Sequence, residues 1–144
     1  MLTDAQIVLR LFLAAALGGI IGFEREKHHR GMAGFRTHIL VSVGSALIML
    51  VSMYIFDIYA GKVPVDPARI AAGVVTGIGF LGAGTIIRSG ESVRGLTTAA
   101  SLWTVSGIGL AVGCGFYIAA WATAIIAFST LYFLRKVPIE EKQE

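Results

Sequence analysis

The chain has little charge and only one cysteine. Asp, Glu, Lys and Arg make up 15% of its 144 residues, compared with about 25% in ordinary soluble domains. The lone Cys114 excludes an intramolecular disulfide and any cysteine-based metal cluster, so we expect it to be a small packing residue. A formal net charge of +3, carried by cations at the ends of apolar segments, does not indicate nucleic-acid binding. It points to lipid headgroups instead.

Apolar and small residues dominate the composition of the chain. Hydrophobic residues form 56% of the chain, 18 residues are glycine, and the mean hydropathy is +0.77. Gly, Ala, Ser and Thr are concentrated between Gly73 and Gly109. Glycine weakens helices in soluble cores, whereas small residues let membrane helices approach closely. The composition therefore predicts an all-α membrane bundle.

Five apolar windows have the roughly 17 to 25 residues that a spanning helix needs. They are Ile7 to Phe23, Thr37 to Phe56, Ala68 to Ile87, Leu96 to Gly113 and Phe116 to Leu134. The first follows Thr3 and Gln6, whose spacing is that of a capping box. We expect one membrane domain over residues 1–136 and a short cytoplasmic tail over 137–144.

The distribution of cations predicts how the spans are oriented. Nine of the twelve Lys and Arg fall in segments 24–36, 88–95 and 135–144, which alternate with the other loops. Because Lys and Arg concentrate on the cytoplasmic side, the amino terminus is predicted outside and the carboxyl terminus inside. An odd number of spans agrees with this.

Glycines in the third window have two competing interpretations. The spacing of Gly77, Gly79 and Gly82 matches a dinucleotide fingerprint, but they lie inside one apolar span, without the strand and acidic residue that a nucleotide site needs. We therefore expect them to pack helices, or to loosen the helix and line an ion path. The first interpretation makes this helix central and touched on two faces. The full set is Gly73, Gly77, Gly79, Gly82 and Gly84, with Gly18 and Gly22 of the first window as candidate partners.

Charged residues are rare inside the windows. Every Asp and Glu lies near a segment end, which disfavours a carboxylate-lined cation carrier. Arg10 lies on the outer side, within an apolar window. Either it extends to the membrane surface as an anchor, or it is buried against Asp66 or a hydroxyl group.

The topology collects a polar cap at the cytoplasmic ends of the spans. Its arginines and a helix amino terminus would suit a phosphate-bearing lipid, a small anion or an acidic loop of a partner, although ordinary positive-inside anchoring explains the same charges. The cap comprises Glu24, Arg25, Arg36, Arg88, Glu91, Arg94, Thr97 and Thr98.

The three histidines do not have the spacing of a metal site. His28 and His29 are adjacent and point apart on a helix, so we expect them in a solvated loop, and His38 lies nearby in sequence. No set of nucleophile, base and orienting acid is recognisable either. We predict no metal, no cofactor and no catalysis.

Several motifs in order resemble the MgtC/SapB family over nearly the whole chain. The most specific are GFLGAG from Gly79 to Gly84 and GLTTAA from Gly95 to Ala100, joined by the charged link. Arg10-Leu11, the run from Gly18 to Arg25, Gly34 with Arg36-Thr37, and Trp103 also fit. The resemblance implies a bacterial inner-membrane protein associated with growth at low magnesium, with intracellular survival in some pathogens and, for some members, with control of the ATP synthase. MgtC itself adds a soluble domain resembling an ACT module, so this chain resembles the short SapB-type branch.

We expect a non-enzymatic modulator of ion or energy homeostasis that works by contact with a membrane partner, such as the ATP synthase or a transporter. A small dimeric ion channel or carrier is the first alternative. A scaffold that binds anionic lipid is the second.

Overall fold

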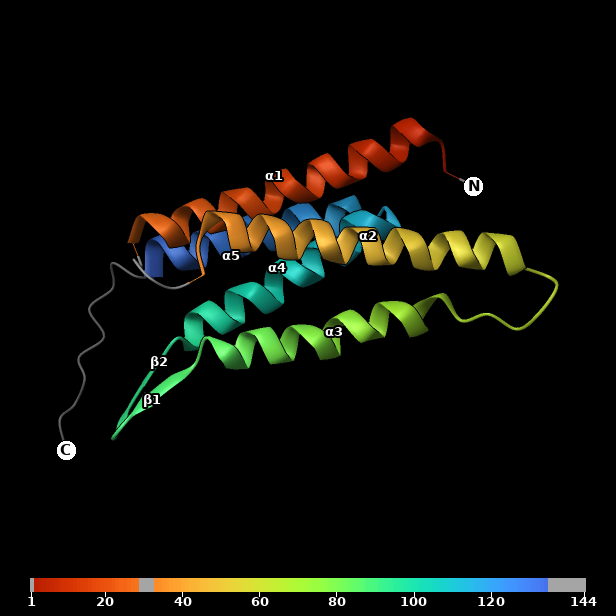
Figure 1. Ribbon diagram of the computed structural model, residues 1–144. Helices are drawn as coiled ribbons and strands as arrows, with labels where there is room; N and C mark the ends of the chain where they lie inside the picture. The colour runs from red at the N-terminus through yellow and green to blue at the C-terminus, as the bar shows by residue number, and fades with distance from the viewer. Residues whose placement is uncertain (1, 29–32, 135–144) are drawn as a thin grey trace.

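The structure, a computed structural model, describes residues 2–28 and 33–134 as a bundle of five helices with one small hairpin (Figure 1). Each of the five apolar windows is confirmed as a helix. The helices are α1 (Asp4–His28), α2 (Phe35–Tyr59), α3 (Pro67–Gly84), α4 (Leu96–Cys114) and α5 (Tyr117–Phe133). The hairpin is β1 (Ile87–Ser89) and β2 (Ser92–Arg94).

Four of these helices, α1 to α4, are long and apolar enough to cross a membrane, whereas α5 has 17 residues. Consecutive helices run in opposite directions, so the start of α1 and the end of α5 lie at opposite ends of the bundle (Figure 1). The predicted capping box is present, since the Thr3 amide donates to Gln6 Oε1 at 3.0 Å and the Gln6 amide donates to Thr3 Oγ1 at 3.3 Å.

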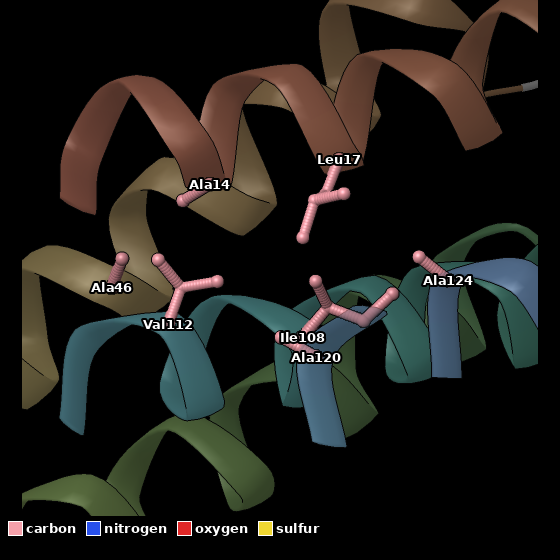
Figure 2. Packing of buried hydrophobic residues seen from close by; sticks show 7 residues of the cluster. All are labelled: Ala14, Leu17, Ala46, Ile108, Val112, Ala120 and Ala124. Carbon is pink, nitrogen blue, oxygen red and sulfur yellow. The ribbon is translucent and has the colours of Figure 1, made fainter. Parts of the chain in front are cut away.

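The centre of the bundle is α4, which contacts all four other helices. Half of its membrane window is buried within the chain. The apolar core lies where α4 meets α1, α2 and α5, and four of its seven members are alanine, which allows the backbones to approach closely (Figure 2). Its members are Ala14, Leu17, Ala46, Ile108, Val112, Ala120 and Ala124.

Close helix contacts are made by two pairs of glycines that both face α2. A Cβ on Gly18 would lie 2.7 Å from Ser42 Cβ, and one on Gly22 would lie 2.8 Å from the Cα of Phe35. On α4, a Cβ on Gly113 would lie 2.7 Å from the carbonyl oxygen of Ala46, and one on Gly109 would collide with that of Ser42. Each pair has the i, i+4 spacing that places both residues on one helix face. They bring α1 and α4 against α2.

The prediction of a central third helix is wrong for the single chain. In Figure 1, α3 lies at the edge of the bundle, and only 11% of its window is buried. A Cβ on Gly73, Gly77, Gly79 or Gly84 would meet nothing within 4 Å from other helices among residues 2–28 and 33–134, and one on Gly82 would make ordinary contact with Ala99 at 3.6 Å. The predicted pairing of Gly18 and Gly22 with this helix is also wrong, since both contact α2.

The charged link between α3 and α4 forms a β-hairpin that was not predicted. Helix α3 ends at Gly84 instead of near Ile87, and β1 pairs with β2 so that Ser89 lies opposite Ser92. Gly90 has φ 60° as the first central residue of the two-residue turn, a position that favours glycine. The hairpin extends beyond the helix ends on the predicted cytoplasmic side (Figure 1).

Candidate functional site

Six polar side chains are buried together between α1, α2 and α4, towards the end of the bundle that the charge distribution predicts to be cytoplasmic. We call this group the buried polar network. None of its members is more than 6% exposed. They are Glu24 and Arg25 of α1, His38 and Ser42 of α2, and Thr98 and Ser101 of α4.

Arg25 joins α1 to α4 inside the network. It is 2% exposed, and its Nη2 donates to Thr98 Oγ1 at 2.6 Å. The short distance is typical of a hydrogen bond whose donor is charged. Its Nε has no hydrogen-bond partner among the described residues. Charged groups within membrane helices are costly and mark functional positions, so this arginine is the strongest single indicator of a site.

His38 joins α2 to α4 in the same layer. Its side chain is fully buried, with Nδ1 2.8 Å from the Gly34 carbonyl oxygen and Nε2 3.0 Å from Ser101 Oγ. Ser101 Oγ in turn lies 2.8 Å from the carbonyl oxygen of Thr98. Thr98 therefore links the two halves of the network, since its hydroxyl accepts from Arg25 and its carbonyl faces Ser101.

Small residues explain why polar groups can be buried here. A Cβ on Gly22 would lie 2.9 Å from His38 Cβ, and one on Gly18 would lie 2.8 Å from the His38 carbonyl oxygen. With no side chains in between, α1 lies directly on α2 and closes over the histidine. A second hydroxyl pair, Ser45 on α2 and Ser106 on α4 at 3.3 Å, lies one to two turns further along the same interface.

The predicted polar cap divides into two parts. Glu24, Arg25 and Thr98 are buried in the network. Glu24 lies near the end of α1, as predicted, but it is buried there, with only 4% of its surface exposed. The remaining members are exposed, and they are Arg36, Arg88, Glu91, Arg94 and Thr97.

His38 lies within the predicted second window, but its burial was not predicted. It lies in the first turn of α2, and the sequence did contain a usable signal. His38, Ser42, Ser45 and Ser52 recur at helical spacing and form one polar stripe in an apolar helix, and all four are buried. His29 and the side chain of His28 lie outside the described residues. In the described part, no three His, Cys, Asp or Glu side chains come together as a metal site would require.

Arg10, at the opposite end of the bundle, is buried against a hydroxyl instead of anchored at the surface. It is 9% exposed. Its Nε donates to the Tyr117 hydroxyl at 3.0 Å, its Nη1 donates to the Gly113 carbonyl oxygen at 2.7 Å, and its guanidinium lies 5.7 Å from the centre of the Tyr117 ring. Asp66, the other suggested partner, instead caps α3 by accepting from the Ala68 amide at 2.8 Å.

An open apolar groove of about 830 Å³ separates α2 from α3. Gly44, Gly73 and Gly77 line it, and none of them would bring a Cβ within 4 Å of another group. Two of the predicted packing glycines of α3, Gly73 and Gly77, thus line an open groove of this chain.

The sequence matches known proteins along most of its length. The model of the MgtC family matches residues 11–139. The putative magnesium transporter YhiD of Escherichia coli K12 is 50% identical over 115 residues, which cover 78% of this chain and 53% of that protein. Protein MgtC of Salmonella typhimurium LT2 is 46% identical over 129 residues, covering 90% of this chain and 52% of that protein.

Protein SapB of Bacillus subtilis is 38% identical over 149 aligned positions, covering 98% of this chain and 63% of that protein. The chain thus spans about half the length of the first two relatives and under two thirds of the third. No solved structure matches it significantly. The family match and the long apolar helices identify the chain as a membrane protein of the MgtC family.

Proposed function

We propose that this chain is a non-enzymatic modulator of magnesium-linked ion or energy homeostasis in the bacterial inner membrane, and that it acts by binding another membrane protein. The observation that carries the proposal is the open groove between α2 and α3. The link to magnesium rests on the relative that is called a putative magnesium transporter.

The groove has the surface chemistry that a partner helix needs. Membrane helices associate where small residues allow close backbone contact, and Gly44, Gly73 and Gly77 supply this on both walls. The aliphatic side chains of Leu40 and Ile48 lie on the α2 wall and would pack beside the incoming helix. We assign the groove to a helix of a partner, such as the ATP synthase or a transporter.

The exposed hairpin would contribute a second, polar contact. Arg88 and Arg94 are exposed on strands that extend past the helix ends, and Arg36 is exposed at the start of α2 on the same side. Arginine forks bind carboxylates and phosphates in two-point geometry. An acidic loop of the partner or an anionic lipid headgroup would fit this surface.

Affinity purification from native membranes tests the proposal. We expect the tagged chain to recover a membrane protein, and Gly77→Leu to lose it because the new side chain fills the groove. Gly79→Leu is the matched control, because Gly79 is equally open but does not line the groove. Combined Arg36→Ala, Arg88→Ala and Arg94→Ala should weaken recovery. If the tagged chain recovers only a second copy of itself, the groove is the interface of a homodimer and the proposed partner is wrong. If no partner is found and the purified chain alone moves ions, the modulator proposal fails.

Ion transport by a dimer is the second candidate, and the buried polar network favours it. Glu24, Arg25 and His38 are charged or titratable groups within membrane helices, which is typical of ion and proton paths. Flux through proteoliposomes, measured for magnesium, potassium, protons and phosphate, separates the two functions. Absence of flux for all four would exclude transport by the chain alone.

A further inference from the structure

The three hydrogen bonds around His38 cannot all be made while its imidazole is neutral. Nδ1 lies 2.8 Å from the carbonyl oxygen of Gly34. A carbonyl oxygen only accepts, so Nδ1 carries a hydrogen and donates. In a neutral imidazole, Nε2 is then the acceptor and needs a donor facing it.

Ser101 faces Nε2 and has one proton to give. Its Oγ is 3.0 Å from Nε2 and 2.8 Å from the carbonyl oxygen of Thr98, and a hydroxyl donates one hydrogen bond at a time. If His38 is neutral, Ser101 donates to Nε2. If Nε2 also carries a proton, it donates to Ser101 Oγ, and Ser101 donates to Thr98. Both arrangements satisfy the imidazole without moving a heavy atom.

We propose that His38 and Ser101 form a proton-binding site within the α1–α2–α4 interface. In proton uptake, the Ser101 O–H bond breaks as its proton moves to the Nε2 lone pair and forms an N–H bond, and Ser101 Oγ binds a replacement proton, so the chain gains one proton in total. Uptake leaves the Ser101 O–H directed at the Thr98 carbonyl and the imidazole cationic. The replacement proton comes from water.

The location gives the site a route to the surface. Ser101 is 6% exposed and lines a groove of about 270 Å³ between α4 and α5, whereas His38 is fully buried. The hydroxyl therefore lies between the groove and the imidazole. From this position the Ser101 hydroxyl can accept a proton on the side of the groove and donate its own proton to Nε2 of His38.

Charged groups lie near the imidazole, so its protonation changes the electrostatic interactions between α1, α2 and α4. Helix α1 contributes Arg25 and Glu24 to the same network and Glu26, whose Oε2 accepts from the Phe35 amide at 2.7 Å. Helix α4 contributes the hydroxyls of Thr98 and Ser101. Each proton bound adds a positive charge beside Arg25, so the packing of α1 on α2 and α4 becomes sensitive to proton activity. The inference needs no partner protein and stands independently of the proposed function.

Histidine nitrogen NMR on the full chain in lipid nanodiscs tests the site. Replacing both other histidines, His28→Gln and His29→Gln, leaves His38 as the one imidazole to observe. We expect the neutral form to carry its hydrogen on Nδ1, opposite to the tautomer that free histidine prefers, and acid to add a second proton at Nε2. A neutral form protonated on Nε2 would overturn the proposal. So would a neutral imidazole that never takes up a second proton while the protein stays folded.

Ser101→Ala, compared with Ser106→Ala, tests the role of the hydroxyl. Ser106 is a buried serine on the same helix that pairs with Ser45 instead. A hydrogen bond from a charged donor is stronger than one between neutral groups, so Ser101→Ala should lower the proton affinity of His38 about tenfold. Ser106→Ala should leave it unchanged. If His38 titrates equally in both variants, Ser101 takes no part in binding the proton. If Ser101→Ala does not fold, the tautomer and titration measurements in the His28→Gln, His29→Gln background decide the proposal.

Discussion

Two glycine-rich regions of this chain have opposite roles. Gly18, Gly22, Gly109 and Gly113 lie where α1 and α4 press on α2, and each would place a Cβ within 3 Å of a neighbouring atom. Gly73 and Gly77 of α3 have the same i, i+4 spacing, but a Cβ on either would meet no atom within 4 Å from other helices in the described part of the chain. The i, i+4 spacing of glycines therefore indicates that a helix has a face of small residues. Only the fold shows whether another helix of the same chain packs against that face.

The largest expected effect comes from Gly109→Ala. The new methyl group would collide with the carbonyl oxygen of Ser42 and lie 2.8 Å from Ser45 Cβ, so α2 and α4 would have to separate. We expect a loss of about 3 kcal/mol of stability. It is measured as a fall in the thermal unfolding midpoint of the purified protein in detergent.

The matched control for this variant is Gly107→Ala. Gly107 lies two residues away on α4, and a Cβ there would meet nothing within 4 Å. The Gly107→Ala variant should have a thermal unfolding midpoint equal to or slightly above that of the unmodified chain. Equal midpoints for Gly107→Ala and Gly109→Ala would contradict the close packing of α4 on α2.

Thr98→Val should have the second largest effect. Valine keeps the shape of the side chain but cannot accept the hydrogen bond from Arg25 Nη2 at 2.6 Å. A charged donor would then be buried without that acceptor. We expect a loss of about 2 kcal/mol, measured by the same unfolding midpoint. Thr97→Val, at the exposed neighbouring position, should change little, and a comparable loss there would show that the effect is not specific to the network.

The sequence predicted the bundle well because its signals are strong and local. Apolar windows of membrane length, the capping box at Thr3 and Gln6, and motifs shared with the family each depend on neighbouring residues. The short hairpin was missed because three-residue strands such as Ile87–Ser89 have too few residues to show a pattern. Its turn signal, Ser89-Gly90, lay within a link too short to suggest structure.

The candidate site was predicted in part, for a physical reason. Charge and topology brought Glu24, Arg25 and Thr98 to one end of the bundle, and the structure buries them together. What the sequence could not show is which helices touch. With α3 taken as central, Gly18 and Gly22 were given the wrong partner, and the burial of His38 beneath them was not apparent. Burial depends on the neighbours of a helix, which its own sequence does not specify.

Tyr117→Phe is a smaller change, and it tests the contact of α1 with α4 and α5 at the end of the bundle that is predicted to face outwards. Phenylalanine removes the hydroxyl that accepts from Arg10 Nε at 3.0 Å, but it keeps the ring beside the guanidinium and leaves the bond to Gly113. We expect a loss of about 1 kcal/mol in the unfolding midpoint. Tyr54→Phe, at a side chain that is 55% exposed, is the control. An unchanged midpoint for Tyr117→Phe would show that the bond from Arg10 to this hydroxyl contributes nothing to stability.

The smallest effect is expected from Gly77→Ala, which tests most directly whether the two glycine-rich regions differ in their packing. Alanine is the better helix former, and its Cβ would meet nothing within 4 Å outside its own helix turn among the described residues, so the isolated protein should gain up to about 1 kcal/mol. This sign is opposite to that for Gly109→Ala. The gain should be seen in detergent, where partners have been removed. If Gly77→Ala destabilises the purified chain, the α3 face is already filled by a tightly bound copy or partner, and the two glycine regions have the same role.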